Sequence, residues 1–384
     1  MTGLPWPAAR VCGHAAAAPL AAAELPLAAC LGATLAAPVV ARAALPAFDL
    51  AAMDGYAVRG PGPWRVTGRR LAGVVHAGEG RALARDEAVE IATGAPLPAG
   101  AEAVLPYEEA IREGDRLRGP AAPDRNVRRT GEDWPAGAEL IGVGAPVTPA
   151  VLGVASSAGH DVLTVRPRPR VAALITGDEV ISHGLPGAGR VRDAVGPMLP
   201  GALHAFSADL TARDYLPDRP DELGLALAAG RADVVVTVGT ASVGPADHLR
   251  GVLRELGAEL VVSGVAVRPG HPQVLARLPD QRLVIGLPGN PLAAMAAICT
   301  LVGPVVAGLS GRSLPELALV RLTGAVRADP ELTRLVVVRS GGGVAEPTGR
   351  DRPGTLWGAA LGDAFAAVPP AWDGASPVSL VPLP

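Results

Sequence analysis

Three continuous apolar runs in the second half of the chain constrain its fold more than any other feature. They occupy residues 171–175, 234–238 and 283–285. Segments with helical character alternate with them, near residues 197–207, 221–230, 246–257 and 291–308. Strands that are apolar at every position are typical of a parallel sheet whose two faces are covered by crossover helices. The sequence therefore predicts an α/β domain in this region.

The rest of the chain predicts β-rich domains around this α/β domain. With 384 residues, the chain is longer than one hydrophobic core usually serves. Short apolar runs broken by glycine and proline fill about residues 64–140 and return after residue 312, a pattern typical of small β domains. We expect the alanine-rich residues 15–45 to be helical in part. A stiff Arg-Pro linker at residues 166–170 leads into the α/β domain.

Composition excludes several classes of function. All 34 basic residues are arginine, so neither a lysine Schiff base nor a Walker A phosphate loop is possible. The formal net charge of −3, without a basic block, argues against a nucleic-acid partner. Three distant cysteines, Cys12, Cys30 and Cys299, predict neither a disulfide framework nor a zinc site and indicate a reducing compartment. Residues 1–30 lack a signal-peptide pattern, so we expect a cytoplasmic protein.

One uncharged segment, residues 283–309, has the length and composition of a membrane span. It contains Pro288, Asn290, Pro291 and Pro304. Because proline lacks a backbone N–H and clashes with the preceding turn, we expect these residues to break any single helix. A buried strand, a loop and a helix are therefore favoured over a membrane span.

Three glycine-containing loops follow the apolar runs directly. They comprise residues 176–179, 239–244 and 286–291, and ligands of open α/β sheets bind at such carboxyl ends of strands. Glycines let backbone amides approach an anion, and the helix that follows adds partial positive charge. The same rim carries carboxylates, which suit magnesium, at Asp178, Glu179 and Asp247. A nucleotide or phosphate site with a divalent cation is the favoured interpretation, and plain turns are the alternative.

Several other features are ambiguous by themselves. Asn290 is one of only two asparagines in the chain, and its side chain could either contact a ligand or brace its own loop. Residues 53–58 have the pattern of a capped turn, and residues 127–133 have that of an exposed charged turn. Residues 93–101 indicate only a loop. None of these segments predicts a function alone.

Taken together, these segments resemble the molybdopterin molybdenumtransferases, the family of MoeA and the gephyrin E domain. The resemblance spans about residues 24–295 and rests on motifs in a fixed order: MDGYAV, TGAPLPAGAEAVLP, VRRTGEDWPAG, PRVAALITGDEV, VGTASVGPADHL, RPGHP and GLPGNP. It implies insertion of molybdate into adenylated molybdopterin, with magnesium and with release of AMP. It also implies a homodimer whose subunits share the active site, with a molybdopterin adenylyltransferase as the donor of the pterin.

The resemblance further implies the fold class, α/β plus β-rich domains, in an elongated four-domain subunit with a central molybdopterin-binding-like α/β domain. The expected domains are a linker and dimerisation domain (22–40 and 138–167), a small β-rich domain (41–137), the α/β domain (1–21 and 168–311) and a C-terminal β domain (312–384). The active site is then expected in a cleft to which distant segments contribute.

Position by position, the resemblance implies a set of acidic and ligand-binding residues. The catalytic carboxylates would be Asp54, Asp133, Glu179, Asp218 and Asp247, of which Glu179, Asp218 and Asp247 would hold magnesium. The cofactor-binding residues would be Thr93, Thr176, Gly177, Gly239, Ser242, Gly244, Arg268, His271, Gly289, Asn290, Pro291 and Thr355. Of these, Asp54, Asp133 and Thr93 would reach across the dimer.

The oxyanion-binding side departs from the family pattern. Where the family shows K-P-G-K-P, this chain has Arg268 and His271 in place of the two lysines. Ala293 stands where the family usually has a hydroxyl side chain. An ordinary histidine is mostly uncharged near neutral pH, so these replacements remove one cation and one hydrogen-bond donor.

The C-terminal domain matches the family less closely. Thr355 approximates an expected glycine-serine motif, and the anion-binding arginine would be Arg334 or Arg339. Two hypotheses remain open. The chain is either a working transferase that rebuilds the oxyanion site from Arg268, His271 and Thr355, or a catalytically impaired paralogue that binds pterin or nucleotide as a carrier or regulator. The sequence leaves both molybdate and tungstate open as the oxyanion.

Overall fold

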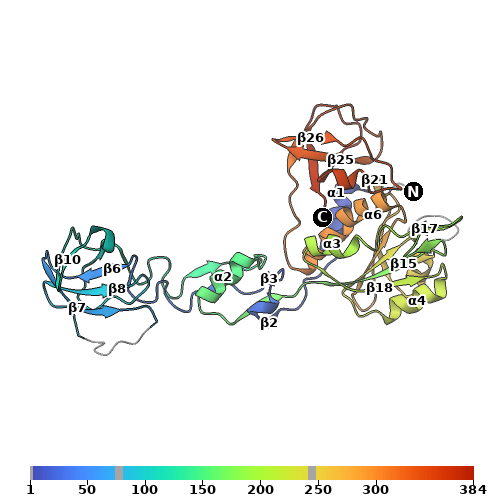
Figure 1. The fold of residues 1–384 in the computed structure, drawn as a ribbon. Helices are drawn as coiled ribbons and strands as arrows, with labels where there is room; N and C mark the ends of the chain where they lie inside the picture. The colour runs from blue at the N-terminus through green and yellow to red at the C-terminus, as the bar shows by residue number, and fades with distance from the viewer. Residues whose placement is uncertain (1–2, 74–80, 241–247) are drawn as a thin grey trace.

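The computed structural model describes residues 3–73, 81–240 and 248–384, and the chain in it is elongated (Figure 1). A small sheet domain occupies one end, and a narrow region with short strands and one helix follows it. An α/β domain with a second sheet beside it occupies the other end. The predicted fold class, α/β plus β-rich domains in an elongated multidomain chain, is confirmed.

The α/β domain is built on a six-stranded sheet in the order β18-β15-β19-β23-β22-β20. Its strands are β15 (Arg170–Thr176), β18 (Asp209–Leu216), β19 (Val234–Val238), β20 (Glu259–Ser263), β22 (Val274–Arg277) and β23 (Leu283–Leu287). The three predicted apolar runs form the adjacent parallel strands β15, β19 and β23, and every residue of β19 and β23 is buried.

Helices cover both faces of this sheet, because side chains alternate between the faces along each strand. Val234, Val236 and Val238 pack on one side with α1 (Trp6–Ala15) and α3 (Leu199–Ala205). Val235 packs on the other side, beneath α4 (Pro220–Ala229) and α5 (Leu249–Glu255). The helices expected after each strand are therefore confirmed.

The apolar segment after β23 forms one continuous helix. It consists of α6 (Pro291–Ala297), a wide π-helical turn (Ile298–Val302) and α7 (Gly303–Leu309). The break expected at Pro304 is wrong, because the wider turn before the proline gives its ring room that a regular helix lacks. This helix is long and apolar enough to cross a membrane, but 94% of its most hydrophobic window is buried within the protein, the pattern of a core helix.

A seven-stranded sheet joins the two ends of the chain to the α/β domain, in the order β1-β21-β25-β26-β24-β28-β27. Its strands are β1 (Leu4–Pro5), β21 (Val265–Arg268), β24 (Leu319–Leu322), β25 (Thr333–Gly341), β26 (Val344–Pro347), β27 (Ala364–Val368) and β28 (Val378–Pro382). Strand β21 pairs in parallel with β25, and Arg268 lies opposite Arg334. This pairing brings the R-P-G-H-P segment to the C-terminal sheet.

The far end of the molecule is a six-stranded sheet in the order β10-β11-β7-β8-β6-β9. Its strands are β6 (Gly55–Val58), β7 (Trp64–Arg70), β8 (Glu87–Ile91), β9 (Ala103–Pro106), β10 (Ile111–Glu113) and β11 (Arg116–Arg118). A further pair at the base of this domain is formed by β5 (Leu50–Ala51) and β12 (Val127–Arg128).

The narrow middle region contains α2 (Pro149–Ser157) and two small sheets. These are formed by β2 (Ala23–Pro26), β3 (Thr34–Leu35) and β14 (Val162–Arg166), and by β4 (Val39–Val40) and β13 (Glu139–Ile141). The helix expected within residues 15–45 is largely wrong, since only a 3-10 turn at Leu27–Ala29 follows the end of α1. Prolines at 19, 26, 38 and 46 outweigh the helical propensity of alanine here.

Candidate functional site

A cavity of about 680 Å³ lies where the α/β domain meets the C-terminal sheet. The loops after β21 and β23 form one wall, through Arg268, His271, Asn290 and Ala293. The opposite wall comes from the C-terminal domain and carries Arg327, Asp329, Arg334, Asp351 and Arg352. Two motifs that the sequence singled out, R-P-G-H-P and L-P-G-N-P, therefore lie side by side.

Backbone geometry requires glycine in the wall of this cavity. Gly270 has φ +103°, and a Cβ there would lie 3.1 Å from the carbonyl oxygen of Ala293. A side chain at this position would be strained and would separate the two loops. The glycine of the R-P-G-H-P motif thus allows its close packing against the helix that follows the L-P-G-N-P loop.

The cavity carries an excess of positive charge. Its lining includes four arginines and two aspartates, which leaves two positive charges when arginines and carboxylates alone are counted. The N–H groups of Glu331 and Leu332 each donate to Asp329 at 3.0 Å. Together with the nearby Arg268 and Arg334, they hold the pKa of Asp329 below its ordinary value. A positively charged, partly enclosed cavity of this kind suits an oxyanion.

Arg334 is already engaged by protein groups. Its Nη2 lies 2.5 Å from an oxygen of Asp351, and its Nη1 donates to the carbonyl of Arg327 at 3.1 Å. Arg339 lies toward the other end of β25, and its Nε donates to the carbonyl of Leu361 at 2.7 Å. Of the two arginines that the sequence offered, only Arg334 lines the cavity.

The predicted residues of the R-P-G-H-P and L-P-G-N-P segments differ in their hydrogen bonds. The Nδ1 of His271 lies 2.7 Å from the carbonyl oxygen of Val265, so that nitrogen bonds to the backbone. Asn290 is exposed, precedes α6 and makes no side-chain cap bond to that helix. Gly289 is exposed beside it, and Pro291 begins the helix. Asn290 thus faces the cavity without bracing its own helix.

Thr355 lies outside the cavity lining. Its hydroxyl oxygen accepts a hydrogen bond from the backbone N–H of Trp357 at 3.1 Å. The C-terminal wall instead presents Arg327 and Arg352, which the sequence analysis missed. No motif marks them, and the lysine-free composition makes arginine an uninformative residue in this chain.

The rim of the parallel sheet holds the other predicted ligand residues. The hydroxyl of Thr176 donates to the carbonyl of Val238 at 2.9 Å and joins the ends of β15 and β19. Gly177 and Gly239 have φ values of +135° and +99°, and a Cβ on Gly239 would lie 2.8 Å from the carbonyl oxygen of Thr176. These residues shape the rim through their backbone. Ser242, Gly244 and Asp247 lie outside the described residues.

Two carboxylates face each other across this rim. The N–H of Asp178 donates to Asp218 at 3.4 Å, and the N–H of Asp218 donates to Asp178 at the same distance. Glu179 is exposed beside them. Across residues 3–73, 81–240 and 248–384, no group of three or more His, Cys, Asp or Glu side chains is close enough to hold a metal ion.

The remaining predicted residues lie outside the α/β domain. Asp54 precedes β6, and one of its oxygens accepts hydrogen bonds from the N–H of Thr93 at 2.7 Å and from the hydroxyl of Thr93 at 3.0 Å. Asp133 forms an ion pair with Arg128. The sheet of β6 and β8, beside which Asp54 and Thr93 stand, is separated from β15 by the narrow middle region (Figure 1). Asp133 lies between β12 and β13, and β13 belongs to that middle region. Neither Asp54 nor Asp133 therefore lies beside Glu179 within one chain.

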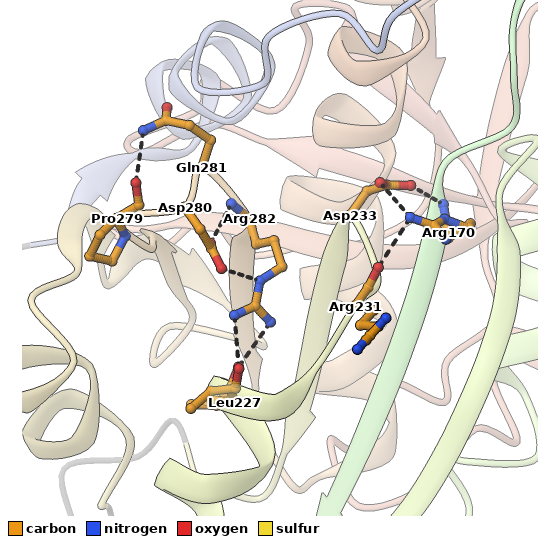
Figure 2. Close-up of polar contacts among 9 residues, drawn as sticks. Arg170, Leu227, Arg231, Asp233, Pro279, Asp280, Gln281 and Arg282 are labelled. Carbon is orange, nitrogen blue, oxygen red and sulfur yellow. Dashed lines mark hydrogen bonds and ion pairs between the residues drawn. The ribbon is translucent and has the colours of Figure 1, made fainter.

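Charged side chains at the starts of the parallel strands, opposite the rim, are paired with other protein groups (Figure 2). The backbone N–H of Arg170 donates to Asp233 at 2.7 Å. The Nε of Arg282 lies 2.6 Å from Asp280, and its Nη1 donates to the carbonyl of Leu227 at 2.9 Å. These pairs fix the starts of the strands, much as Arg334 is engaged by Arg327 and Asp351 in the cavity.

The chain matches two protein-family models. Residues 7–159 match the MoeA N-terminal region (domain I and II), and residues 172–308 match the probable molybdopterin binding domain. Both matches fall on segments that contribute the predicted site residues.

Curated relatives and solved structures agree with these models. The chain is 35% identical to molybdopterin molybdenumtransferase 2 of Mycobacterium tuberculosis over 299 residues, and this match covers 73% of each chain. It is 34% identical to the molybdopterin molybdenumtransferase of Haemophilus influenzae, over 70% of this chain and 68% of the relative. A crystal structure of the molybdopterin biosynthesis MoeA protein of Pyrococcus horikoshii superposes with a TM-score of 0.79 at 25% identity, over 99% of both chains.

Proposed function

The chain belongs to the molybdopterin molybdenumtransferase family, and from that membership we infer that it inserts molybdate into adenylated molybdopterin, with release of AMP. It is a transferase of molybdenum cofactor biosynthesis. The curated relatives are named molybdopterin molybdenumtransferases, and the chain matches them over most of their length. They therefore do not favour the alternative of a carrier or regulator without activity.

One observation carries the assignment to a specific site. The cavity at the C-terminal sheet brings the R-P-G-H-P and L-P-G-N-P motifs together with arginines from a different domain. Arginine is well suited to oxyanions, because its planar guanidinium donates two parallel hydrogen bonds and stays charged. Molybdate would bind here, at the end of the sheet where the ligands of α/β domains bind.

The carboxylates of the rim would hold magnesium against the diphosphate of the substrate. Glu179 and Asp218 offer the hard oxygen ligands that magnesium prefers, and the backbone N–H of Asp178 donates a hydrogen bond to Asp218. Asp247 would complete the set. Magnesium would neutralise charge on the bond between the two phosphates. The protein residues would orient the diphosphate and exclude other anions.

A second copy of the chain would supply Asp54, Thr93 and Asp133. Asp54 and Thr93 stand beside β6 and β8 of the small sheet domain, at the other end of the elongated chain from the α/β domain (Figure 1), so an intramolecular approach to Glu179 would require the middle region to fold back on itself. An antiparallel homodimer would place the small domain of one subunit over the rim of the other. The proposed active site is therefore shared between subunits.

The pathway and location follow from the chemistry. The substrate is an adenylated pterin, so an adenylyltransferase acting on molybdopterin must precede this step. The three cysteines are free thiols, in keeping with a reducing compartment such as the cytoplasm.

The reaction can be tested with purified protein, magnesium, molybdate and adenylated molybdopterin. We expect AMP to be released only when molybdate is present, because transfer of the metal is coupled to loss of the nucleotide. Assays with tungstate in place of molybdate identify the preferred oxyanion. Pterin binding without oxyanion-dependent release of AMP would contradict the proposed function and support the carrier.

A further inference from the structure

We propose that Arg327 and Arg352 bind the incoming oxyanion in this chain and that Arg334 positions them. The inference rests on the proposed function, because it concerns the same cavity. It assigns the positive charge of that cavity chiefly to the C-terminal domain, where the resemblance to the family offered only Arg334 or Arg339 as an anion ligand.

The first argument is the free hydrogen-bonding capacity of Arg327 and Arg352. Both line the cavity, and both are exposed. Among the residues that the structure describes, neither guanidinium donates to a carboxylate or to a carbonyl group. Arg282 at the opposite edge of the sheet is fully engaged by comparison (Figure 2). An unpaired guanidinium keeps five N–H donors and a full positive charge for a ligand.

The second argument is that one side chain fixes both loops. Arg334 donates through Nη1 to the backbone carbonyl of Arg327, and its Nη2 is paired with Asp351, the neighbour of Arg352. The Arg334 side chain is 32% exposed and that of Asp351 is 39% exposed, so this bridge lies at the wall of the cavity. Arg334 has fewer donors left for a ligand than the two arginines that it holds.

The third argument is that the Arg352 loop is also attached to the opposite wall. The backbone N–H of Leu292 donates to the carbonyl of Pro353 at 2.9 Å. Leu292 belongs to the first turn of α6, which begins directly after Asn290. The loop that carries Arg352 is therefore held both by the C-terminal sheet and by the L-P-G-N-P segment.

The fourth argument is that the wall formed by the loops after β21 and β23 offers few side-chain donors to an oxyanion. His271 uses its Nδ1 for the carbonyl of Val265, and Ala293 has no polar side-chain atom. Only Arg268 on that wall retains a permanent positive charge. Two unpaired arginines on the opposite wall offset this loss, because a tetrahedral oxyanion is recognised by the donors around it and not by the domain they come from.

Binding of molybdate alone tests the two proposed ligands. We expect Arg327→Gln and Arg352→Gln each to weaken molybdate binding by roughly tenfold or more in isothermal titration calorimetry of the full chain, since a charge-assisted hydrogen bond is lost. Arg339→Gln is the matched control. It removes an arginine of the same domain outside the cavity and should leave the affinity unchanged.

The outcomes distinguish the roles of Arg327 and Arg352 from the proposed function. Wild-type molybdate affinity in both Arg327→Gln and Arg352→Gln would overturn the inference, provided that thermal unfolding shows both variants folded. Arginine-dependent binding without release of AMP would contradict the proposed function and leave the inference intact. If a glutamine variant fails to fold, the alanine variant at the same position also removes the charge and is measured in its place, with the same expected loss of affinity.

A separate measurement tests the positioning role of Arg334. Arg334→Lys keeps the positive charge but cannot reach both the carbonyl of Arg327 and the carboxylate of Asp351 in the same way. We expect its KM for molybdate to rise by roughly tenfold, while its KM for adenylated pterin and its kcat stay near wild type. Wild-type kinetics would overturn the positioning role, and so would an equal loss in every parameter, which indicates general structural damage.

Discussion

At the scale of single residues, Asp54 is held in its ionised form by Thr93. The backbone N–H of Thr93 is the main cause of the lowered pKa of Asp54, and the hydroxyl of Thr93 adds to it. A lowered pKa means that this interaction stabilises the protein above the ordinary pKa of aspartate and is lost as the pH falls through the lowered value. At neutral pH the carboxylate of Asp54 is therefore charged.

We expect Thr93→Val to raise the pKa of Asp54 toward the ordinary aspartate value, because the variant loses the hydroxyl and keeps the backbone N–H. NMR titration of the carboxyl carbon measures the shift. Thr130→Val is the matched control, since Thr130 donates to Asp49 through its N–H at 2.8 Å and its hydroxyl at 2.9 Å. This control should move Asp49 and leave Asp54 unchanged. A pKa of Asp54 that is insensitive to Thr93→Val would show that the hydroxyl contributes nothing.

His271 provides a second prediction at this scale. We expect His271→Lys to strengthen molybdate binding, since one permanent charge near an oxyanion is worth on the order of 1–3 kcal/mol. Calorimetric titration of molybdate measures the change. His271→Gln adds no charge and should bind like the wild type. Unchanged or weaker binding by the lysine variant would show that residue 271 does not face the anion.

At the scale of elements, a hydrogen bond to a buried carboxylate joins β18 to the loop before α3. The hydroxyl of Tyr215 donates to Asp193 at 2.8 Å, and the N–H groups of Val195 and Gly196 donate to the other oxygen of Asp193 at 2.9 Å. Asp193 is only 8% exposed. Burial raises the pKa of Tyr215, and the carboxylate of Asp193 raises it further.

We expect Tyr215→Phe to lower the unfolding free energy of the α/β domain by about 1–3 kcal/mol, because it leaves a buried carboxylate oxygen without its donor. Urea denaturation followed by a probe in this domain measures the loss. Tyr107→Phe, followed by a probe in the small sheet domain, is the control, since the hydroxyl of Tyr107 donates at 2.7 Å to Glu90, whose side chain is more exposed. Water can replace that donor, so the control should cost less. Equal losses would contradict the role of burial.

At the scale of the whole molecule, the elongated shape separates the two halves of the proposed site (Figure 1). Asp54 and Thr93 belong to the small sheet domain, Asp133 to the segment between that domain and the middle region, and Glu179 and Asp218 to the α/β domain. A homodimer with shared sites would therefore contain each half in a different subunit. Such an arrangement makes a specific prediction for mixed dimers.

We expect Asp54→Asn and Glu179→Gln to be inactive separately and to recover about a quarter of wild-type AMP release after mixed refolding. Random pairing makes half of the dimers mixed, and each mixed dimer has one of its two sites intact. A mixture of Asp54→Asn with Asp133→Asn is the control. It should stay inactive, because one site of each mixed dimer then contains Asp54→Asn and the other contains Asp133→Asn. An inactive first mixture would contradict a shared site, provided that mixed dimers form.

The α/β domain could be predicted from local pattern because its strands are buried on both faces. Strands β19 and β23 have no exposed residue, so their sequences are almost entirely apolar and predict central strands of the sheet. The glycine loops after these strands could be located for a related reason. Their backbone conformations disfavour other residues, as at Gly239 after β19 and likewise at Gly177 after β15.

Other features required long-range structure. The wide turn before Pro304 keeps one helix continuous through a residue that usually ends helices. The parallel pairing of β21 with β25 places Arg268 opposite Arg334, although 65 residues separate them in the chain. No local pattern encodes that register, because it depends on how two domains pack.

The sequence by itself determined the α/β fold and the loops that end its strands, whereas the acidic residues were expected only from the resemblance to the family. The fold and the loops follow from burial and from backbone conformation, which act residue by residue and leave a local pattern. Only the tertiary structure decided which arginines face the anion cavity and that Asp54 lies far from Glu179 in one chain. Contacts of that kind arise when separate domains pack together, and the residues that make them carry no mark in the sequence.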